Sequence, residues 1–439
     1  MGSTGYTARL RSLYREHRVL IWLSTVIFVN QLGFGSIIPV QALYAKSFGV
    51  SQSAIGLSIA VYGLSRFLVN VPAGRLADRI GRRWTLVLGE VVTGVGNILC
   101  GTAGSFELFL LFRFMAGAGG AIMQTTGSII LADISTKANR GRTIAVYHGI
   151  FLFAVGVGPL PGGLLAEHVG LNAPFYAFGA LGLLAAVLAF DKVPETKGQS
   201  ERTPLAPGAA LEPLSLSFGK QLRVLFSQVG FVLVSLVSFI QFFSRTGGIF
   251  GVVPLLGAMK LGLRADEIGV GLTLVSVANL GVVQISGMLA DRFGRKAVLV
   301  PASFLTALSF SAFAVAPGFG WFVASLALWG IAAGISGPAP SAYAADVAPR
   351  GMNAVTMSCY MMVADLGYVV GPLLMGLWSD LYGIEAALFA TSAIYLFVAT
   401  LFALFAPETA PRRRSKGASA AANAGAVASE GIGLSREGR

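Results

Sequence analysis

Six ionisable side chains interrupt otherwise apolar stretches of this chain of 439 residues. They are Arg66, Glu90, Arg113, His148, Arg245 and Asp365. A charge at the centre of a membrane helix costs at least about 2.5–3.5 kcal/mol unless it is compensated. Burial favours the neutral form of a carboxyl group, which suits a proton carrier, and a guanidinium suits the binding of an anionic group. These residues therefore indicate proton and solute binding, and a static pair of Arg66 with Asp365 is the structural alternative.

The stretches that hold these residues have the length of membrane spans. The chain is 55% hydrophobic and 12% charged, against about 25% charged residues in a soluble domain. About 20 apolar residues form a helix that crosses the hydrocarbon core. The apolar runs lie near residues 19–44, 52–73, 84–104, 106–130, 142–166, 172–190, 227–257, 267–290, 297–315, 319–343, 353–378 and 384–405. The sequence therefore predicts an all-α integral membrane protein with twelve transmembrane helices.

A ten-residue phrase occurs twice in the chain. Gly74–Arg83 returns as Gly287–Lys296, at an offset of 213 residues. The same offset relates Asp133 to Asp346, Gly158-Pro159 to Gly371-Pro372, and Pro194-Glu195-Thr196 to Pro407-Glu408-Thr409. Repetition at one spacing predicts two homologous, pseudo-symmetric six-helix bundles. The predicted regions are an N-terminus (1–18), a first bundle (19–190), a linker (191–226) with a surface helix near 215–225, a second bundle (227–405) and a disordered tail (406–439).

Charge placement predicts the orientation in the membrane. The chain has 32 Lys and Arg against 20 Asp and Glu. With both termini in the cytoplasm, only Lys46, Lys260 and Arg264 fall outside, and three arginines fall within spans. The positive-inside rule then accounts for the net charge of +12 without a nucleic-acid partner. The basic cluster at 412–414 is interpreted as a topology signal, with contact to anionic lipid head groups as the alternative.

Signatures of soluble enzymes are missing from the sequence. There is no Walker A phrase, so ATP hydrolysis by this chain is not expected. The histidines His17, His148 and His168 lack the spacing of metal ligands. We therefore predict no enzymatic activity, no cofactor and no metal, and an ion gradient as the source of energy.

The repeated phrase resembles motif A of the major facilitator superfamily. The segment 113–121 resembles the superfamily's motif B, and 154–163 resembles motif C, the glycine-proline signature of antiporters, with a weaker echo at 367–372. Ala154 stands where motif C usually has Gly. Together the motifs are most similar to those of the twelve-span drug:proton antiporters.

This resemblance implies two bundles that rock about a central cavity. The first, fourth, seventh and tenth spans would line the cavity, and the second, fifth, eighth and eleventh would form the seam between the bundles. The substrate-binding candidates are then Gln31, Phe34, Arg113, Gln124, Gln241 and Arg245. The proton-coupling candidates are Glu90, His148 and Asp365. A structural role for Arg113 and Arg245 is the alternative.

In the family, motif A is thought to latch one conformation through its Asp. The corresponding residues are Gly74, Asp78, Arg79, Gly81, Arg82, Gly287, Asp291, Arg292, Gly294 and Arg295. Gly81 and Gly294 permit a turn at positive φ, and Gly74 and Gly287 allow tight helix contact. A topology clamp with no moving role is the alternative.

Motif C predicts close packing at the seam. Its candidate residues are Gly158, Pro159, Gly162, Gly163, Gly371 and Pro372. A helix face without side chains admits a neighbouring backbone, and here the eighth span is the expected neighbour.

One departure from the family pattern concerns the substrate. Many drug:proton antiporters have an acid in the first span, where this chain has Asn30 and Gln31. Three intramembrane arginines against two acids give a positive bias that leaves room for anions. We predict a monomeric secondary active transporter in the plasma or bacterial inner membrane that exports amphipathic small molecules in exchange for protons. Uptake or exchange of an organic anion or sugar is one alternative, and a non-transporting receptor or scaffold is another.

Overall fold

The computed structural model describes residues 3–135, 139–198, 218–349 and 352–409, and within them the regular elements are all helical. Twelve of these helices are long and apolar enough to cross a membrane. The predicted fold class is confirmed. The basic cluster at 412–414 and most of the predicted tail lie outside the described residues.

The first bundle contains eight helical elements. They are α1 (Ser3–Ile37), α2 (Gln41–Ser47), α3 (Gln52–Ile80), α4 (Arg82–Thr102), α5 (Phe106–Ile134), α6 (Arg140–Val157), α7 (Pro159–His168) and α8 (Ala173–Lys192). The fifth span is α6 followed by α7, which are separated at Gly158 because Pro159 cannot donate the next helical hydrogen bond. The linker holds α9 (Phe218–Phe226), where a surface helix near 215–225 is predicted.

The second bundle repeats this plan with one irregular span. Its elements are α10 (Val229–Phe243), η2 (Ser244–Val252), α11 (Val253–Leu255), η3 (Leu256–Lys260), α12 (Ala265–Phe293), α13 (Arg295–Ala314), α14 (Phe319–Ser336), α15 (Ala339–Asp346), α16 (Asn353–Tyr382) and α17 (Ile384–Phe405). The segments η2 and η3 are π-helical, a rare geometry that is frequent at functional sites. The seventh span therefore has a wide turn where Arg245 lies.

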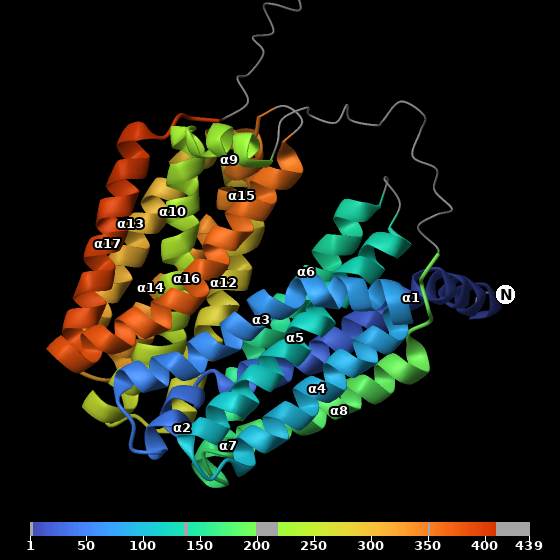
Figure 1. The fold of residues 1–439 in the computed structure, drawn as a ribbon, viewed down its shortest axis with the longest axis horizontal. Coiled ribbons are helices and arrows are strands. Elements are labelled where there is room, and N and C mark those ends of the chain that lie inside the picture. The colour runs from blue at the N-terminus through green and yellow to red at the C-terminus, as the bar shows by residue number, and fades with distance from the viewer. Residues whose placement is uncertain (1–2, 136–138, 199–217, 350–351, 410–439) are drawn as a thin grey trace, which may run out of the picture.

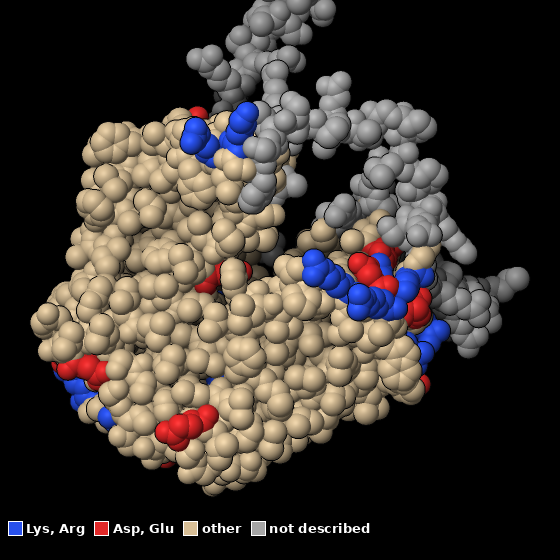
Figure 2. All heavy atoms as spheres, viewed as in Figure 1, with Lys and Arg blue, Asp and Glu red and all other residues tan. Residues whose placement is uncertain are grey.

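The two bundles meet at one end and part at the other. Figure 1 shows them close together near α2 and α7 and separated toward the side that carries α9. We call this side the linker face and the other the opposite face. In Figure 2 a hollow lies between the bundles on the linker face, and charged side chains gather mostly toward the two ends of a broad uncharged belt. The two halves are thus parted on the linker face and close together near the opposite face.

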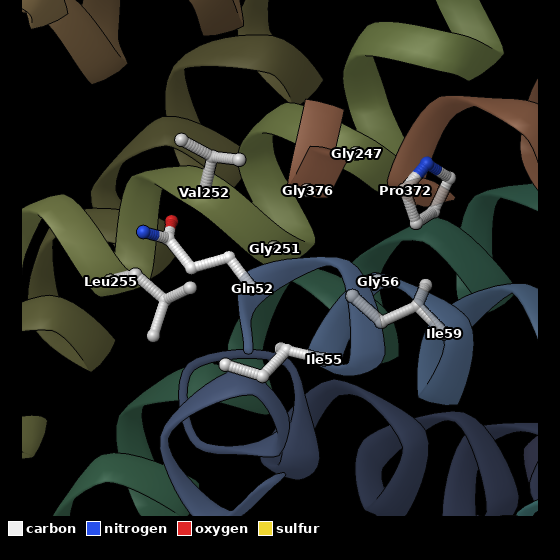
Figure 3. Close-up of a pocket in the computed structure, with 10 residues that line it drawn as sticks. All are labelled: Gln52, Ile55, Gly56, Ile59, Gly247, Gly251, Val252, Leu255, Pro372 and Gly376. Carbon is white, nitrogen blue, oxygen red and sulfur yellow. The ribbon is translucent and has the colours of Figure 1, made fainter. Parts of the chain in front are cut away.

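Backbones touch across the seam near the opposite face. A methyl group on Gly56 of α3 would lie 2.0 Å from the carbonyl oxygen of Pro372 in α16. On the other side of the seam, a methyl on Gly163 of α7 would lie 2.5 Å from the carbonyl oxygen of Ala265 in α12. Figure 3 shows the first of these contacts, with Gly56 beside Pro372. Because no side chain larger than hydrogen fits, the seam is closed at backbone contact here.

The other motif C glycines lie elsewhere than predicted. Methyl groups on Gly158 and Gly162 would lie 2.6 Å from the Cα atom of Gly35 and 1.9 Å from the carbonyl oxygen of Ser36, both within the first bundle. A methyl on Gly371 would meet Phe243 of its own bundle. The expectation that these three glycines face the other half is wrong, because consecutive helical residues point about 100° apart.

Candidate functional site

A cavity of about 740 Å³ lies between the two bundles. Its lining comes from α6 of the first bundle and from the seventh, eighth and tenth spans of the second, with single residues of α13 and α17. The residues that carry polar or aromatic groups into it are His148, Gln241, Arg245, Ser276, Asn279, Thr306, Trp329, Ser336, Ser341 and Tyr395, with Phe151 and Phe242. The first and fourth spans, which were expected to line the cavity, contribute no lining residue.

Arg245 is the cationic centre of this cavity. It lies on the π-helical turn η2, with its guanidinium carbon 5.7 Å from the centroid of the Phe250 ring. It forms no hydrogen bond or ion pair with any residue that the structure describes. None of the described lining residues is Asp or Glu. The cavity therefore presents an uncompensated positive charge, which favours a ligand with an anionic group.

Polar groups of both bundles lie in or beside the wall of this cavity. Gln241 donates to the hydroxyl of Ser336 at 2.6 Å. The hydroxyls of Ser244 and Tyr395 share a hydrogen bond of 3.0 Å. His148 enters from α6 and lies against the rings of Tyr147 and Phe151. The wall thus offers both hydrogen-bonding groups and aromatic surface to a ligand.

Arg113 does not lie in the cavity. Only 1% of its surface is exposed, and its Nη2 donates to Oε1 of Gln41 at 3.0 Å. Its guanidinium also lies over the ring of Tyr62, 4.6 Å from the centroid. The expectation that Arg113 faces the cavity is wrong, because its guanidinium is held inside the first bundle by Gln41 and Tyr62. No motif or spacing pointed to Gln41, which lies at the end of the first apolar run.

The remaining substrate-binding candidates are also engaged within the protein. Gln124 accepts a hydrogen bond from Nη2 of Arg66. Gln31 is buried and donates to Asn30 at 3.2 Å. Phe34 packs on Tyr62 and on Phe250, with ring centroids 5.8 and 6.4 Å away. Of the six candidates, the structure therefore brings only Gln241 and Arg245 to the cavity.

Glu90 is a buried carboxyl group in the first bundle. It has no exposed surface, and its Oε2 accepts from Nδ2 of Asn30 at 2.5 Å. Its Oε1 has no hydrogen-bond partner among the residues that the structure describes. A single neutral donor is poor compensation for a buried charge, so this site is suited to a carboxyl group that takes up a proton. The partner of Glu90 is thus Asn30, which stands in the first span where many drug:proton antiporters have an acid.

Asp365 has a different environment on α16. It is half-buried, and it forms no ion pair or hydrogen bond with the described residues. Arg66 binds Gln124 instead and lies 5.9 Å from the centroid of the Tyr368 ring. The predicted alternative of a static pair between Arg66 and Asp365 is therefore not present in this conformation.

The motif A residues form a network within the first bundle. Arg82 pairs with Asp78 at 3.0 Å and with Asp133 at 3.1 Å. Thr196 donates to the same Asp133 oxygen at 3.0 Å. Arg79, by contrast, only offers its carbonyl oxygen, which accepts from Nζ of Lys197. No described contact of this network reaches the other half.

The second copy is organised in the same way. Arg295 pairs with Asp346 at 3.5 Å, and the guanidinium of Arg292 lies over Phe293. The side chain of Asp291 lies outside the described part of the structure. The two networks are therefore internal to their bundles in this conformation.

The motif A glycines divide into two kinds. Gly81 and Gly294 have φ of 96° and 101°, so the predicted turns at positive φ are confirmed. A methyl group on Gly81 would also lie 2.3 Å from the Glu195 carboxylate. Gly74 and Gly287 have no described atom within 4 Å of such a methyl. The expectation of tight helix contact at these two is wrong for this conformation, because the bundles are parted here.

Glu195 fixes the start of α4. Its carboxylate accepts from the backbone N–H groups of Arg82 at 2.9 Å, Arg83 at 3.2 Å and Lys197 at 2.9 Å. Burial alone would raise the pKa of Glu195, but these donors hold that pKa below its ordinary value. The carboxylate thus caps a helix N-terminus within its own bundle.

Comparison with known proteins places both halves in one family. The model of the Major Facilitator Superfamily matches residues 23–265 and 234–435. An uncharacterized MFS-type transporter of Methanocaldococcus jannaschii is 25% identical over 379 residues, which cover 86% of this chain and 95% of that protein. Multidrug resistance protein 2 of Bacillus subtilis is 26% identical over 377 residues, which cover 84% and 91%. The solved structure of the human organic anion transporter MFSD10 (TETRAN) matches with a TM-score of 0.62 at 19% identity, covering 88% of this chain and 99% of that one.

Proposed function

The chain belongs to the major facilitator superfamily of membrane transporters, and on this premise we propose that it exports amphipathic small molecules in exchange for protons. We further propose that the linker face is cytoplasmic, as the excess of Lys and Arg there indicates. Export is supported by the similarity to a relative that is named as a multidrug resistance protein. The monomer in a plasma or bacterial inner membrane is the proposed working unit.

The uncompensated charge of Arg245 is the observation that carries the substrate class. An aromatic and polar cavity with one free guanidinium suits a molecule that has an apolar body and one anionic group. A cation would meet no described carboxylate in this cavity. We therefore propose that anionic amphiphiles are preferred over cationic ones.

We propose that proton coupling involves Glu90, which is buried, and Asp365, which is half-buried. Glu90 lies close to the first span through Asn30, and Asp365 lies on α16 at the seam. Asp365, at the seam, would change its surroundings when the bundles rock, which is the requirement for binding a proton in one state and releasing it in the other. Glu90 would contribute as a poorly compensated carboxyl group beside the first span. His148, on the cavity wall, is the third candidate.

Transport by the purified protein in proteoliposomes tests the substrate class. The probes are 1-anilinonaphthalene-8-sulfonate and N-phenyl-1-naphthylamine, which differ only by the sulfonate. With a proton gradient imposed, we expect gradient-driven movement of the sulfonate that weakens in Arg245→Lys and more in Arg245→Ala, because the bidentate fork is lost. Equal losses for both probes would mean that Arg245 is structural. No movement of either probe in the wild type would contradict export of anionic amphiphiles.

The same vesicles test proton coupling. Glu90→Gln or Asp365→Asn in the responsible position is expected to abolish uphill transport and to leave downhill exchange intact, because only the proton site is lost. Unchanged gradient-driven accumulation in both single variants and in the double variant would contradict the assignment.

Exchange or uptake of an organic anion on the same fold is the second candidate function. Arg245 favours it as well, and the solved structure with the same fold is named as an organic anion transporter. Loading the vesicles with unlabelled sulfonate separates the two. Exchange is stimulated by substrate on the far side and needs no proton gradient, whereas proton-coupled export depends on that gradient.

A further inference from the structure

Two acids at the opposite face hold the same place in the two halves. Glu167 lies at the end of α7 and Asp380 near the end of α16. Their numbers differ by 213, the repeat offset of the sequence. Neither lies within the segments that resemble motifs A, B and C. The repeat therefore places one carboxyl group at equivalent points on both sides of the seam.

Asp380 caps a helix of the other bundle. Its Oδ1 accepts from the backbone N–H of Gln52 and its Oδ2 from that of Ser53, both at 2.8 Å. These are the first residues of α3, whose N-terminal N–H groups have no partner within the helix. A methyl on Gly376, one turn before Asp380, would lie 2.5 Å from the carbonyl oxygen of Gln52. Figure 3 shows Gln52 and Gly376 at this meeting of α3 and α16.

Glu167 makes the mirror contact at the other end of the seam. Its Oε2 accepts from the backbone N–H of Ala265, the first residue of α12, at 3.2 Å. Its Oε1 also lies 3.9 Å from Nε of Arg264. The first bundle therefore caps α12 of the second, and the second caps α3 of the first. We call these two contacts the crossed caps.

A carboxylate at a helix N-terminus is stabilised by the positive end of the helix dipole and by charge-assisted hydrogen bonds. In the crossed caps the acid and the helix are in different bundles. Opening the seam at the opposite face separates them, so the caps stabilise one state and are absent from the other. A contact with such a differential free energy shifts the conformational equilibrium.

We propose that the crossed caps are a double lock that holds the opposite face closed. Each acid fastens the N-terminus of the first long helix that follows the outer loop of the other half. The lock acts on the rocking motion itself and does not depend on which substrate or ion the chain carries. Loss of transport and loss of the lock can therefore be measured separately.

Distances between paired spin labels test the lock. Thr102 and Val315 lie at the opposite-face ends of α4 and α13, and both are exposed. Trp84 and Ala297 are an exposed pair at the other ends of the same helices. The buried native cysteines, Cys100 and Cys359, are first replaced by Ala. An opening of the opposite face lengthens the first distance and shortens the second.

We expect Asp380→Ala and Glu167→Ala each to raise the ratio of open to closed opposite face about two- to fivefold. The double variant is expected to give about the product of the two, because the caps lie at separate ends of the seam. Asp380→Asn should fall between Ala and wild type, since its amide oxygen can still accept one N–H.

Glu385→Gln is the matched control. Glu385 lies on the same face and in the same half as Asp380, but its ion pair with Lys260, at 2.7 Å, stays within the second bundle. Its loss should leave both distances unchanged. Unchanged distances in the folded double variant would overturn the lock, and so would an equal shift in Glu385→Gln. Melting curves of each variant in detergent identify any that fail to fold, and Asp380→Asn with Glu167→Gln then replaces the Ala pair.

Discussion

The two faces of the molecule use their acids in different ways. On the linker face, Asp133 binds Arg82 and Thr196, and Glu195 caps α4, all within the first bundle. On the opposite face, Asp380 and Glu167 bind helix N-termini of the bundle to which they do not belong. Contacts of the first kind move with their bundle, whereas contacts of the second kind break when the bundles part. Among the described residues, the acids that bind across the seam thus lie on the opposite face, and the acids of the linker face bind within their own bundle.

The motif A network fits this division. Asp78 is 70% exposed in its side chain, and its one ion pair with a described residue is with Arg82, one turn away. A latch through Asp78 would then act in the state in which the linker face is closed, which is not the state described here. The crossed caps and a motif A latch would thus favour opposite conformations.

The largest effect is expected at two adjacent glycines of α7, of which Gly163 faces the seam and Gly162 faces the interior of its own bundle. Gly163→Ala should push α7 from α12, because the methyl would lie 2.5 Å from the Ala265 carbonyl oxygen. Gly162→Ala should push α7 from α1 inside its bundle, where the methyl would lie 1.9 Å from the Ser36 carbonyl oxygen. Overpacking of this kind costs about 1–3 kcal/mol.

The two variants are therefore expected to fail in different assays. Gly163→Ala should shift the label distances toward an open opposite face and keep its melting temperature. Gly162→Ala should melt earlier with its distance distribution preserved. If both variants lose stability equally and neither changes the distances, the division between seam and bundle contacts is wrong at this helix.

A smaller effect is expected from Asp78→Asn. If Asp78 latches the linker face when it closes, the variant should populate the conformation described here more, by a factor of about five, the lower end of the range for linked conformational equilibria. The same label pairs report it, with the distance at Trp84 and Ala297 growing. Asp191→Asn, an exposed acid paired with its neighbour Lys192, is the control. A shift in the other direction would contradict the latch.

The smallest effect concerns pH and the Glu195 cap. The pKa of Glu195 is held below its ordinary 4.5 in the folded protein. A depressed pKa means that the stabilisation is fully present above the unfolded value and is lost as the pH falls through the folded value. Melting temperatures in detergent should therefore fall below about pH 4.5, and less steeply in Glu195→Gln. Parallel curves for the two proteins would contradict the cap. Label distances should not respond to this variant, because the cap lies within one bundle.

Much of the fold could be predicted from the sequence. The twelve apolar runs match the helical spans, because in the bilayer each segment must form its backbone hydrogen bonds within itself. The repeated phrase identified the two halves. The turns at Gly81 and Gly294 followed from residue type alone, since only Gly adopts positive φ without strain. Side-chain partners were harder. The partner of Arg113 proved to be Gln41, and the partner of Glu90 proved to be Asn30, because an amide from any neighbouring helix can form a hydrogen bond with a buried ionisable group.

The sequence by itself determined the number of spans, their duplication and which ionisable side chains are unfavourable to bury in a membrane span. Only the tertiary structure decided which of those side chains find partners inside a bundle and which face the cavity. Arg113 and Arg245 look alike in the sequence, yet one is enclosed by Gln41 and Tyr62 and the other faces the cavity from a π-helical turn. Asp380 and Glu167 look like ordinary loop acids until the bundles meet. The physical reason is that hydrophobic patterning fixes local helices, whereas compensation of charge depends on neighbours that lie far apart in the chain.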